Sequence, residues 1–186
     1  MLVKVENVNL SDFSIVKSKD SHFIRRGMTS PELQTEWMTL EPFCLPSRKY
    51  VTDSDKSLAL MIPLTVDSQL FKFFDGLQQY IISKNLIENK TFNNFIKTKD
   101  GKHYLKLKLY ANTQVFYGKD TVPEPISYIT DFYKHLKADT RARFVLGFSK
   151  LWNMGNDYGF SVVVNRLQID EDSNTSILNK LNFSDD

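Results

Sequence analysis

Cationic and aromatic side chains alternate with leucines along one short segment, residues 102–110. Because successive side chains of a β-strand point to opposite faces, a strand over residues 103–110 would separate the cations and rings from the leucines. The polar face would then carry Lys102 at its edge and Tyr104, Lys106, Lys108 and Tyr110 along its length. Aromatic rings stack on unpaired bases and ammonium groups follow phosphates, so this face predicts a surface for single-stranded nucleic acid. The alternative is that these side chains only cover the solvent side of an amphipathic strand.

Arginine pairs supply a second basic element. Arg141 and Arg143 fall on one face of a strand-like segment over residues 141–152, and guanidinium groups pair with phosphate or stack on a base. Arg25 and Arg26 would widen the basic track, and Trp152 completes the set of candidate nucleic-acid contacts. Each pair by itself is typical of a solvated surface. Only their convergence on one sheet face would make them a site.

Motifs of common enzyme classes are missing from the sequence: it has no P-loop, no Gly-x-Gly-x-x-Gly, no Gly-x-Ser-x-Gly and no His-Glu-x-x-His. The three histidines, His22, His103 and His135, are far apart and have no cysteine or aspartate companions at metal-ligand spacing. His103 also falls on the apolar face of its strand. We therefore expect no catalysis, no metal and no cofactor.

The single cysteine, Cys44, excludes an internal disulfide and fits a reducing compartment. The charged, alternating first residues are unlike a signal peptide, and no apolar run approaches the roughly 20 residues that a membrane span needs. These features predict an intracellular protein of the cytoplasm or nucleus of a host cell, neither secreted nor bound to a membrane.

Charge is distributed unevenly along the chain, whose formal net charge is +2. From Asp170 to the end, five acids stand against the single Lys180, which gives this segment a net charge of −4 and leaves +6 on residues 1–169. A basic body with an acidic tail favours a polyanionic partner for the body. We therefore predict a nucleic-acid-binding domain over residues 1–169 and an acidic C-terminal tail over residues 170–186.

Hydrophobic periodicity predicts mostly strands with one prominent helix. The expected strands cover residues 2–8, 13–18, 21–26, 57–66, 103–110, 112–117, 141–152 and 160–169, and residues 27–55 are expected to be mostly loop. The prominent helix is expected over residues 68–84, with Asp67 as its N-cap. Shorter helices are expected over residues 88–97 and 126–136.

This order of elements predicts a mainly β protein with inserted helices. It fits an OB-type five-stranded Greek-key barrel, which has its helix between strands 3 and 4. Residues 2–8, 13–26 and 57–66 would be the first three strands, and residues 112–117 would form a hairpin with the 103–110 strand or extend it. Residues 153–159 would be a hairpin loop between the last two strands. An irregular antiparallel sandwich is the alternative.

A family resemblance rests on Phe144-Val-Leu-Gly-Phe-Ser-Lys-Leu-Trp152, followed by Tyr158-Gly-Phe-Ser-Val-Val-Val. A strand that ends in Leu-Trp, a short loop and then Tyr-Gly before an alternating strand resembles the C-terminal half of OB-fold single-stranded DNA-binding proteins of tailed phages and large eukaryotic DNA viruses. The resemblance covers roughly residues 100–170. It implies that Trp152 closes the barrel end and that Gly159 supplies a positive φ.

The same resemblance implies a protein that coats unwound DNA beside a polymerase and a helicase. The acidic tail would contact those partners or compete with DNA for the basic groove. The alternative role for the tail is that its apolar residues dock locally or on a second subunit, as in a homodimer. These residues are Ile177, Leu178, Leu181 and Phe183.

Taken together, the residues and the resemblance predict a non-catalytic single-stranded DNA-binding protein of viral or phage replication and recombination. It would bind by stacking and phosphate contacts without strong sequence preference. The alternative is a virion or other structural interaction protein, in which the 14 Phe, 8 Tyr and 2 Trp residues serve as core and subunit interface.

Overall fold

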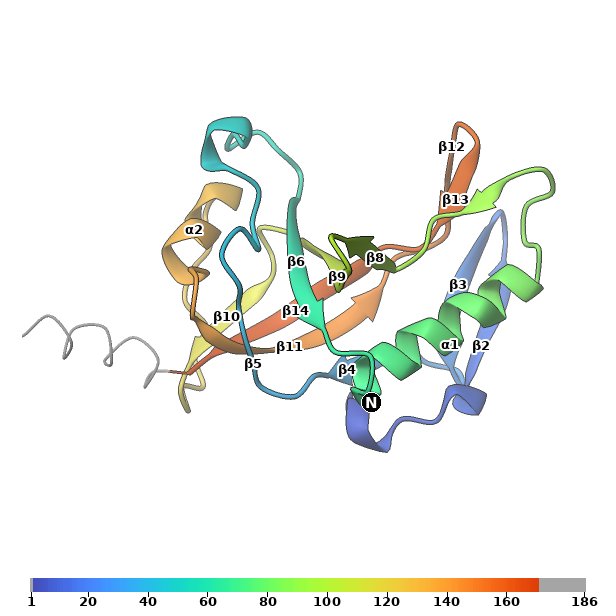
Figure 1. The fold of residues 1–186 in the computed structure, drawn as a ribbon, viewed down its shortest axis with the longest axis horizontal. Helices are drawn as coiled ribbons and strands as arrows, with labels where there is room; N and C mark the ends of the chain where they lie inside the picture. Colours follow the sequence, from blue (N-terminus) through green and yellow to red (C-terminus); the bar gives the residue numbers. More distant parts are fainter. Residues whose placement is uncertain (1, 171–186) are drawn as a thin grey trace, which may run out of the picture.

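Mixed β-sheets dominate residues 2–170, the part of the 186-residue chain that the computed structural model describes (Figure 1). Within that part, the largest sheet has nine strands. They are β1 (Leu2–Lys4), β4 (Glu32–Gln34), β5 (Met38–Thr39), β6 (Leu58–Leu64), β8 (Ile96–Lys99), β9 (Lys102–Leu109), β10 (Gln114–Tyr117), β11 (Arg141–Phe148) and β14 (Val162–Ile169). The expected class, mainly β, is confirmed.

The large sheet follows the path β1-β4-β11-β14-β9-β6, while β5 pairs with β11, β8 with β9 and β10 with β14. Most neighbours are antiparallel, but the pairs β1–β4, β10–β14 and β14–β9 run in parallel. The central strand β9 pairs along its whole length with β6, from Leu58↔Leu109 to Leu64↔His103. Its other edge meets β8 and the start of β14, where Val162 lies opposite Leu107.

Two smaller sheets flank the large one. Strands β2 (Phe13–Ser18) and β3 (Ser21–Arg26) form an antiparallel hairpin. Strands β12 (Trp152–Met154) and β13 (Asp157–Gly159) form a second hairpin, which rises at the upper right of Figure 1, and β7 (Thr91–Phe92) pairs in parallel with β13. The remaining regular elements are the 3-10 turns Val5–Asn7, Leu10–Asp12, Arg48–Tyr50 and Ile129–Asp131 and the helices α1 (Gln69–Ser83) and α2 (Phe132–His135).

Helix α1 joins the β2–β3 hairpin to the large sheet. The Ser68 hydroxyl accepts a hydrogen bond from the Phe71 amide at 3.1 Å, so Ser68 is the N-cap and the predicted Asp67 is one residue early. Phe73 meets Phe13 of β2 at 5.0 Å between ring centroids, whereas Phe74 meets Phe95 at 5.5 Å. The helix thus packs on both sides through neighbouring aromatic rings. No helix in the described residues is long and apolar enough to cross a bilayer.

The two faces of β9 differ as the alternation predicts. Leu105, Leu107 and Leu109 are fully buried, while Lys106 between them is exposed. The neighbouring strand β6 adds Leu58, Leu60 and Ile62 to the same apolar face. Each of these side chains contributes roughly 1.5–3 kcal/mol by burial, which fixes the register, because a slip by one residue would bury the lysines instead.

Three predicted elements differ from the structure in type, pairing or length. Residues 88–97 contain β7 and the start of β8 instead of a helix. Phe92 and Phe95 pack against each other there, with ring centroids 5.4 Å apart. Strand β10 pairs in parallel with β14 instead of forming a hairpin with β9. The 27–55 region is mostly loop, as predicted, and also contains the short strands β4 and β5, which pair with β11. The 126–136 helix shortens to one 3-10 turn followed by α2.

The predicted assignment of the first three barrel strands also needs correction. β1 ends at Lys4, and residues 13–26 form the β2–β3 hairpin outside the large sheet. Phe13 and Ile24 are buried, and Phe13 packs against α1, so this hairpin covers the helix instead of joining the sheet. The predicted 153–159 loop carries most of the β12–β13 hairpin.

The alternation on β9 can be tested by paired substitutions on the same strand. Leu107→Ala should lower the free energy of unfolding by about 2–5 kcal/mol, because it removes a fully buried side chain from a packed core. Lys106→Ala, one residue away on the exposed face, should change it by no more than about 0.5 kcal/mol. Urea denaturation measures both values, and similar losses for the two variants would contradict this register.

Candidate nucleic-acid interface

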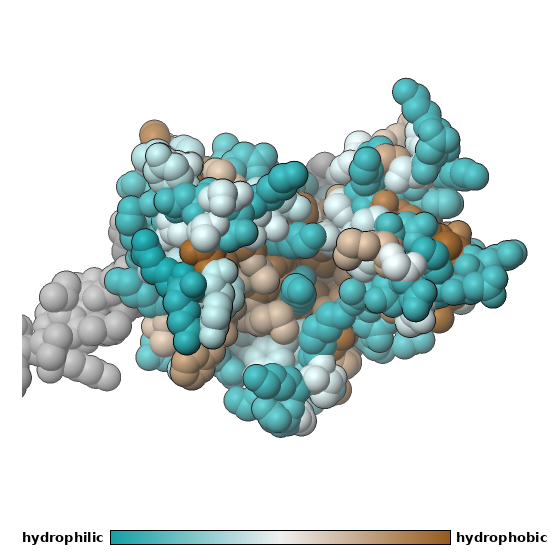
Figure 2. Space-filling view, turned by 90° about the horizontal axis from the view of Figure 1, so that it is seen from above, coloured by the Kyte–Doolittle hydropathy of each residue, from teal (hydrophilic) through white to brown (hydrophobic). Residues whose placement is uncertain are grey.

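An open groove with a volume of about 540 Å³ lies between strands β8 and β9 and the β12–β13 hairpin. Its basic lining consists of Lys97, Lys106 and Lys108, and Trp152 and Phe160 contribute aromatic rings. Seen from above Figure 1, the molecule is hollowed between two mainly hydrophilic lobes, with more apolar surface at the bottom of the hollow (Figure 2). The groove therefore combines cations and rings: Lys106 and Lys108 come from the predicted polar face of residues 102–110, whereas the rings come from other segments.

Each lysine reaches the groove because of the local strand pattern. Lys106 and Lys108 point away from the buried leucines of β9. On β8, Lys97 lies opposite Tyr104 of β9, on the same face of the sheet. Two antiparallel strands therefore bring three ammonium groups to one surface, although Lys97 and Lys108 are separated by a turn in the sequence.

The surroundings of Lys97 in the groove disfavour its charged form. Burial lowers the pKa of Lys97, the charge of Lys106 lowers it further, and the charge of Asp157 partly opposes these effects. The Lys97 ammonium donates a hydrogen bond to the Asn93 side-chain oxygen, a neutral partner. Within the described residues, none of the three lysines forms an ion pair and no carboxylate lines the groove. An anion bound here would stabilise all three charges.

Trp152 takes its position from the glycine opposite it. Trp152 pairs with Gly159 across the β12–β13 hairpin, and a Cβ at Gly159 would lie 2.9 Å from the indole Cζ2. The absence of a side chain therefore lets the ring approach the backbone of β13. The predicted positive φ at Gly159 is wrong, since the described glycines in that conformation are Gly27, Gly101, Gly118 and Gly155. Gly155, with φ of 58°, makes the turn of this hairpin instead.

Further contacts hold the hairpin in place. The Lys90 ammonium donates to the Asn153 side-chain oxygen and to the Gly155 carbonyl, both at 2.6 Å. Tyr158 of β13 is buried against Phe92 of β7, with ring centroids 5.6 Å apart. This wall of the groove is therefore fixed by residues 90–92 as well as by its own turn.

Two other predicted residues of β9 lie on the same face but have protein partners. The Tyr104 hydroxyl donates to Glu41 Oε2 at 3.3 Å, and Lys102 pairs with Glu41 Oε1 at 3.4 Å. Tyr110 lies beyond the end of β9, where it lines a separate hollow together with Glu32 and Arg166. The lysine face thus continues from the groove toward Glu41, while Tyr110 belongs to another surface.

The predicted arginines do not line the groove. Arg141 pairs with Asp170 at 3.0 Å, and Arg143 donates to Gln168 at 2.7 Å. Both guanidinium groups stand over the Trp37 ring, at 5.5 and 4.8 Å from its centroid. The expected convergence on one face therefore brings together Lys106, Lys108 and Trp152 and leaves these two arginines elsewhere.

Arg25 and Arg26 belong to the β2–β3 hairpin. Arg25 stands over the Phe23 ring at 5.3 Å and donates to the Ser30 hydroxyl at 2.6 Å, and Arg26 pairs with Asp12 at 3.2 Å. Among the described residues, no cluster of His, Cys, Asp and Glu could hold a metal ion.

Sequence reasoning missed Lys97, Phe160 and Trp37. Lys97 was assigned to a helix, and its strand is only four residues long, too short for alternation to be recognised. Phe160 follows β13, which lies in the expected 153–159 hairpin loop, and Trp37 lies in the 27–55 region next to the two-residue strand β5. In each case the position depends on pairing with a distant strand, and no local pattern could have revealed it.

No protein-family model matches this chain, and no curated protein matches it. Solved structures of phage single-stranded DNA-binding proteins do resemble it. The C-terminally truncated protein of bacteriophage Enc34 has a TM-score of 0.49 and 10% identity, over 83% of this chain and 91% of that one. The Enc34 protein in complex with single-stranded DNA gives 0.49 and 10%, over 83% and 92%. Protein gp2.5 of bacteriophage T7 gives 0.44 and 12%, over 75% and 91%.

These neighbours are phage single-stranded DNA-binding proteins, one of the two groups that the sequence resemblance named. Their TM-scores lie below 0.5 and their identities near 10%, so this likeness carries no argument about function.

Adding one methyl group at Gly159 should displace Trp152. In a Trp37→Phe background, where Trp152 is the remaining tryptophan, Gly159→Ala should shift the indole emission toward that of a solvated ring. It should also cost about 1–3 kcal/mol of stability through overpacking. Fluorescence and urea denaturation measure the two effects, with Trp37→Phe alone as the control. An unchanged emission spectrum would show that the ring does not depend on this glycine.

Proposed function

We propose that this chain is a non-catalytic single-stranded DNA-binding protein whose groove between β8, β9 and the β12–β13 hairpin holds the strand. One observation carries the proposal: among residues 2–170, Lys97, Lys106 and Lys108 form no ion pair, and they converge with Trp152 in a groove with no carboxylate in its lining. The charged form of Lys97 is disfavoured in the free protein and would be stabilised once a polyanion binds.

The lysines would bind phosphates and release condensed counterions. For a single strand, each phosphate neutralised contributes roughly −0.7 to the slope of log affinity against log salt. Contacts by Lys97, Lys106 and Lys108 therefore predict a steep salt dependence. They carry no information about base sequence.

Trp152 would favour unpaired bases over duplex DNA. Its ring is half-buried against Gly159, so it offers its remaining surface to the groove. A base can stack there only after it has left a duplex, and each such stack contributes roughly 1–3 kcal/mol. Every base has a π-face, and binding should therefore tolerate many sequences. The side-chain amides of Asn93, Asn94 and Asn153 add neutral hydrogen-bonding groups to the same lining.

The fold that we propose for this function is an OB-type barrel. Support comes from the single curved path from β1 to β6 and from α1, which follows β6 and precedes β8 and β9 in the chain. The setting that we propose is phage DNA replication or recombination, in which duplexes are unwound. Contacts of the acidic tail with a polymerase or helicase, and dimerisation, belong to the same proposal. The tail beyond Asp170 lies outside the described residues.

Removing two lysines from the groove should weaken binding in a salt-dependent way. We expect Lys106→Ala/Lys108→Ala to lower the affinity for labelled oligo-dT and to reduce the salt slope by about 1.4, because two phosphate contacts are lost. Fluorescence titration at several salt concentrations measures both.

The matched control for that titration is Lys119→Ala/Lys137→Ala, which removes the same charge at two exposed positions outside the groove. It should keep nearly the wild-type slope. If the two double variants lose slope equally, binding follows net charge and not the groove. If the wild-type protein shows no affinity for oligo-dT at low salt, the function itself is rejected.

The lowered pKa of Lys97 makes binding depend on pH. A phosphate beside Lys97 favours the charged amine, so the pKa in the complex should be higher than in the free protein. Affinity should then be greatest below the free pKa and should fall as the pH rises through it toward the bound pKa. Lys97→Arg keeps its charge throughout this range and should remove that part of the decline. Titrations at constant ionic strength compare the two proteins, and parallel pH profiles would contradict a role for Lys97.

A further inference from the structure

Phe43 exposes almost its whole side chain to solvent. It is 96% exposed, compared with 74% for Tyr50 and 56% for Tyr128, the other aromatic residues that stand out among the described residues. A ring of this size gains nothing from such a position in the isolated chain, since it contacts no core. Such exposure favours a ligand or partner that covers the Phe43 ring when it binds.

The backbone at Phe43 is also unusual. Its φ is 66°, in the left-handed region that L-residues with bulky side chains avoid. Most other described non-glycine residues in this region are asparagine or aspartate, which tolerate it, and the exception is Lys19 in the β2–β3 turn. Residues held in such conformations cluster at binding sites, where the surrounding structure imposes them.

Three contacts impose the turn that presents Phe43. The Cys44 amide donates to the Glu41 carbonyl at 3.3 Å, which closes the turn, and the Met61 amide of β6 donates to the Cys44 carbonyl at 2.8 Å. Cys44 itself is buried. The Glu41 side chain reaches Lys102 and Tyr104 of β9. The turn is therefore fixed to both β6 and β9.

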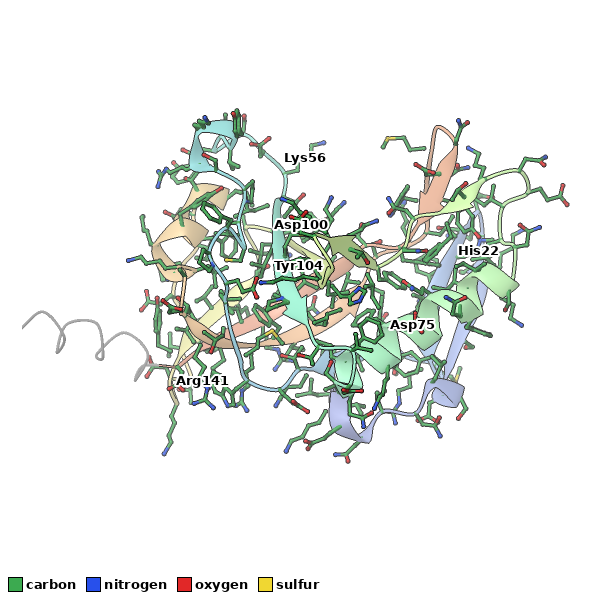
Figure 3. All side chains as sticks on the ribbon, in the orientation of Figure 1. His22, Lys56, Asp75, Asp100, Tyr104 and Arg141 are labelled. Carbon is green, nitrogen blue, oxygen red and sulfur yellow. The ribbon has the colours of Figure 1, made fainter. Side chains whose placement is uncertain are left out.

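These contacts also locate Phe43 relative to the groove. Met61 is the register partner of Lys106, and neighbouring strands are about 4.8 Å apart, so Cys44 lies roughly two strand spacings from Lys106. Tyr104, labelled in Figure 3, lies on the lysine face beside β6, where Glu41 meets it. The loop that joins β5 to β6 and carries Phe43 stands across from the β12–β13 hairpin (Figure 1).

From this placement we infer that Phe43 is a second base-stacking residue, and that a bound single strand runs from Trp152 across Lys108 and Lys106 toward Tyr104 and Phe43. The inference rests on the proposed function and extends it beyond the groove. An exposed ring at one end, a half-buried ring at the other and ammonium groups between them match a chain of bases joined by phosphates. A rigid turn presents the ring without an ordering cost at the moment of binding.

Glycine at position 43 separates stacking from stability. Because glycine adopts positive φ without strain, Phe43→Gly should keep the fold. We expect its affinity for oligo-dT to fall roughly 5- to 100-fold, the equivalent of one lost stack. Phe43→Tyr retains a ring and should bind like the wild type. Tyr128→Ala, which removes an exposed ring near α2, is the control for loss of aromatic surface and should also bind like the wild type.

A strand of the same length made of abasic sugar-phosphate distinguishes stacking from phosphate binding. Wild type and Phe43→Gly should bind it equally, whereas Lys106→Ala/Lys108→Ala should lose affinity for it. Wild-type affinity of Phe43→Gly for oligo-dT would overturn the inference, as would equal losses for oligo-dT and the abasic strand. A lower molecular mass of Phe43→Gly in sedimentation, without a change in DNA affinity, would assign the ring to a protein interface instead.

The same experiments separate this inference from the function on which it rests. If the lysine variant weakens binding and Phe43→Gly does not, only the inference fails. If the wild-type protein binds neither strand, the proposed function fails as well.

Discussion

Burial of the leucines of β9 is the constraint on which the rest of the structure depends. β9 pairs with β6 along one edge and with β8 and β14 along the other. Because Leu105, Leu107 and Leu109 face the core, the lysines between and beside them must face outward, whatever this costs electrostatically. A single register therefore determines both the core and the position of the basic surface.

In the free protein, the groove disfavours the charged form of Lys97. Lys97 is half-buried, and the charge of Lys106 disfavours its protonated form. A structural role would more often place a carboxylate beside such a group, as Glu41 stands beside Lys102 at the other end of the face. The Lys97 ammonium instead donates to the neutral side chain of Asn93, and the charge of Asp157 only partly opposes the effects of burial and Lys106. The arrangement is open to an anionic ligand.

The aromatic residues divide into those that build the groove and those that face it. Phe74, Phe95 and Phe148 lie within about 6 Å of one another and join α1, the approach to β8 and β11. This cluster fixes the segment from which Lys97 projects. Trp152 and Phe43 differ from these rings, since one is half-buried and the other is exposed. Aromatic content alone, which equally suggested a subunit interface, could not separate the two groups.

The sequence by itself determined the local features: the mainly β class, the helix from Gln69 to Ser83, and the outward position of Lys106 and Lys108. These follow from hydrophobic periods of 3.6 and 2, which a single segment expresses alone. Only the tertiary structure decided what lies opposite those lysines. The Val162↔Leu107 pairing and the Lys90–Asn153 contact bring the β12–β13 hairpin and Trp152 to them, and the pairing of β11 with β5 takes Arg141 to Trp37 instead. Such choices depend on contacts between residues far apart in the chain, whose free energies no local pattern records.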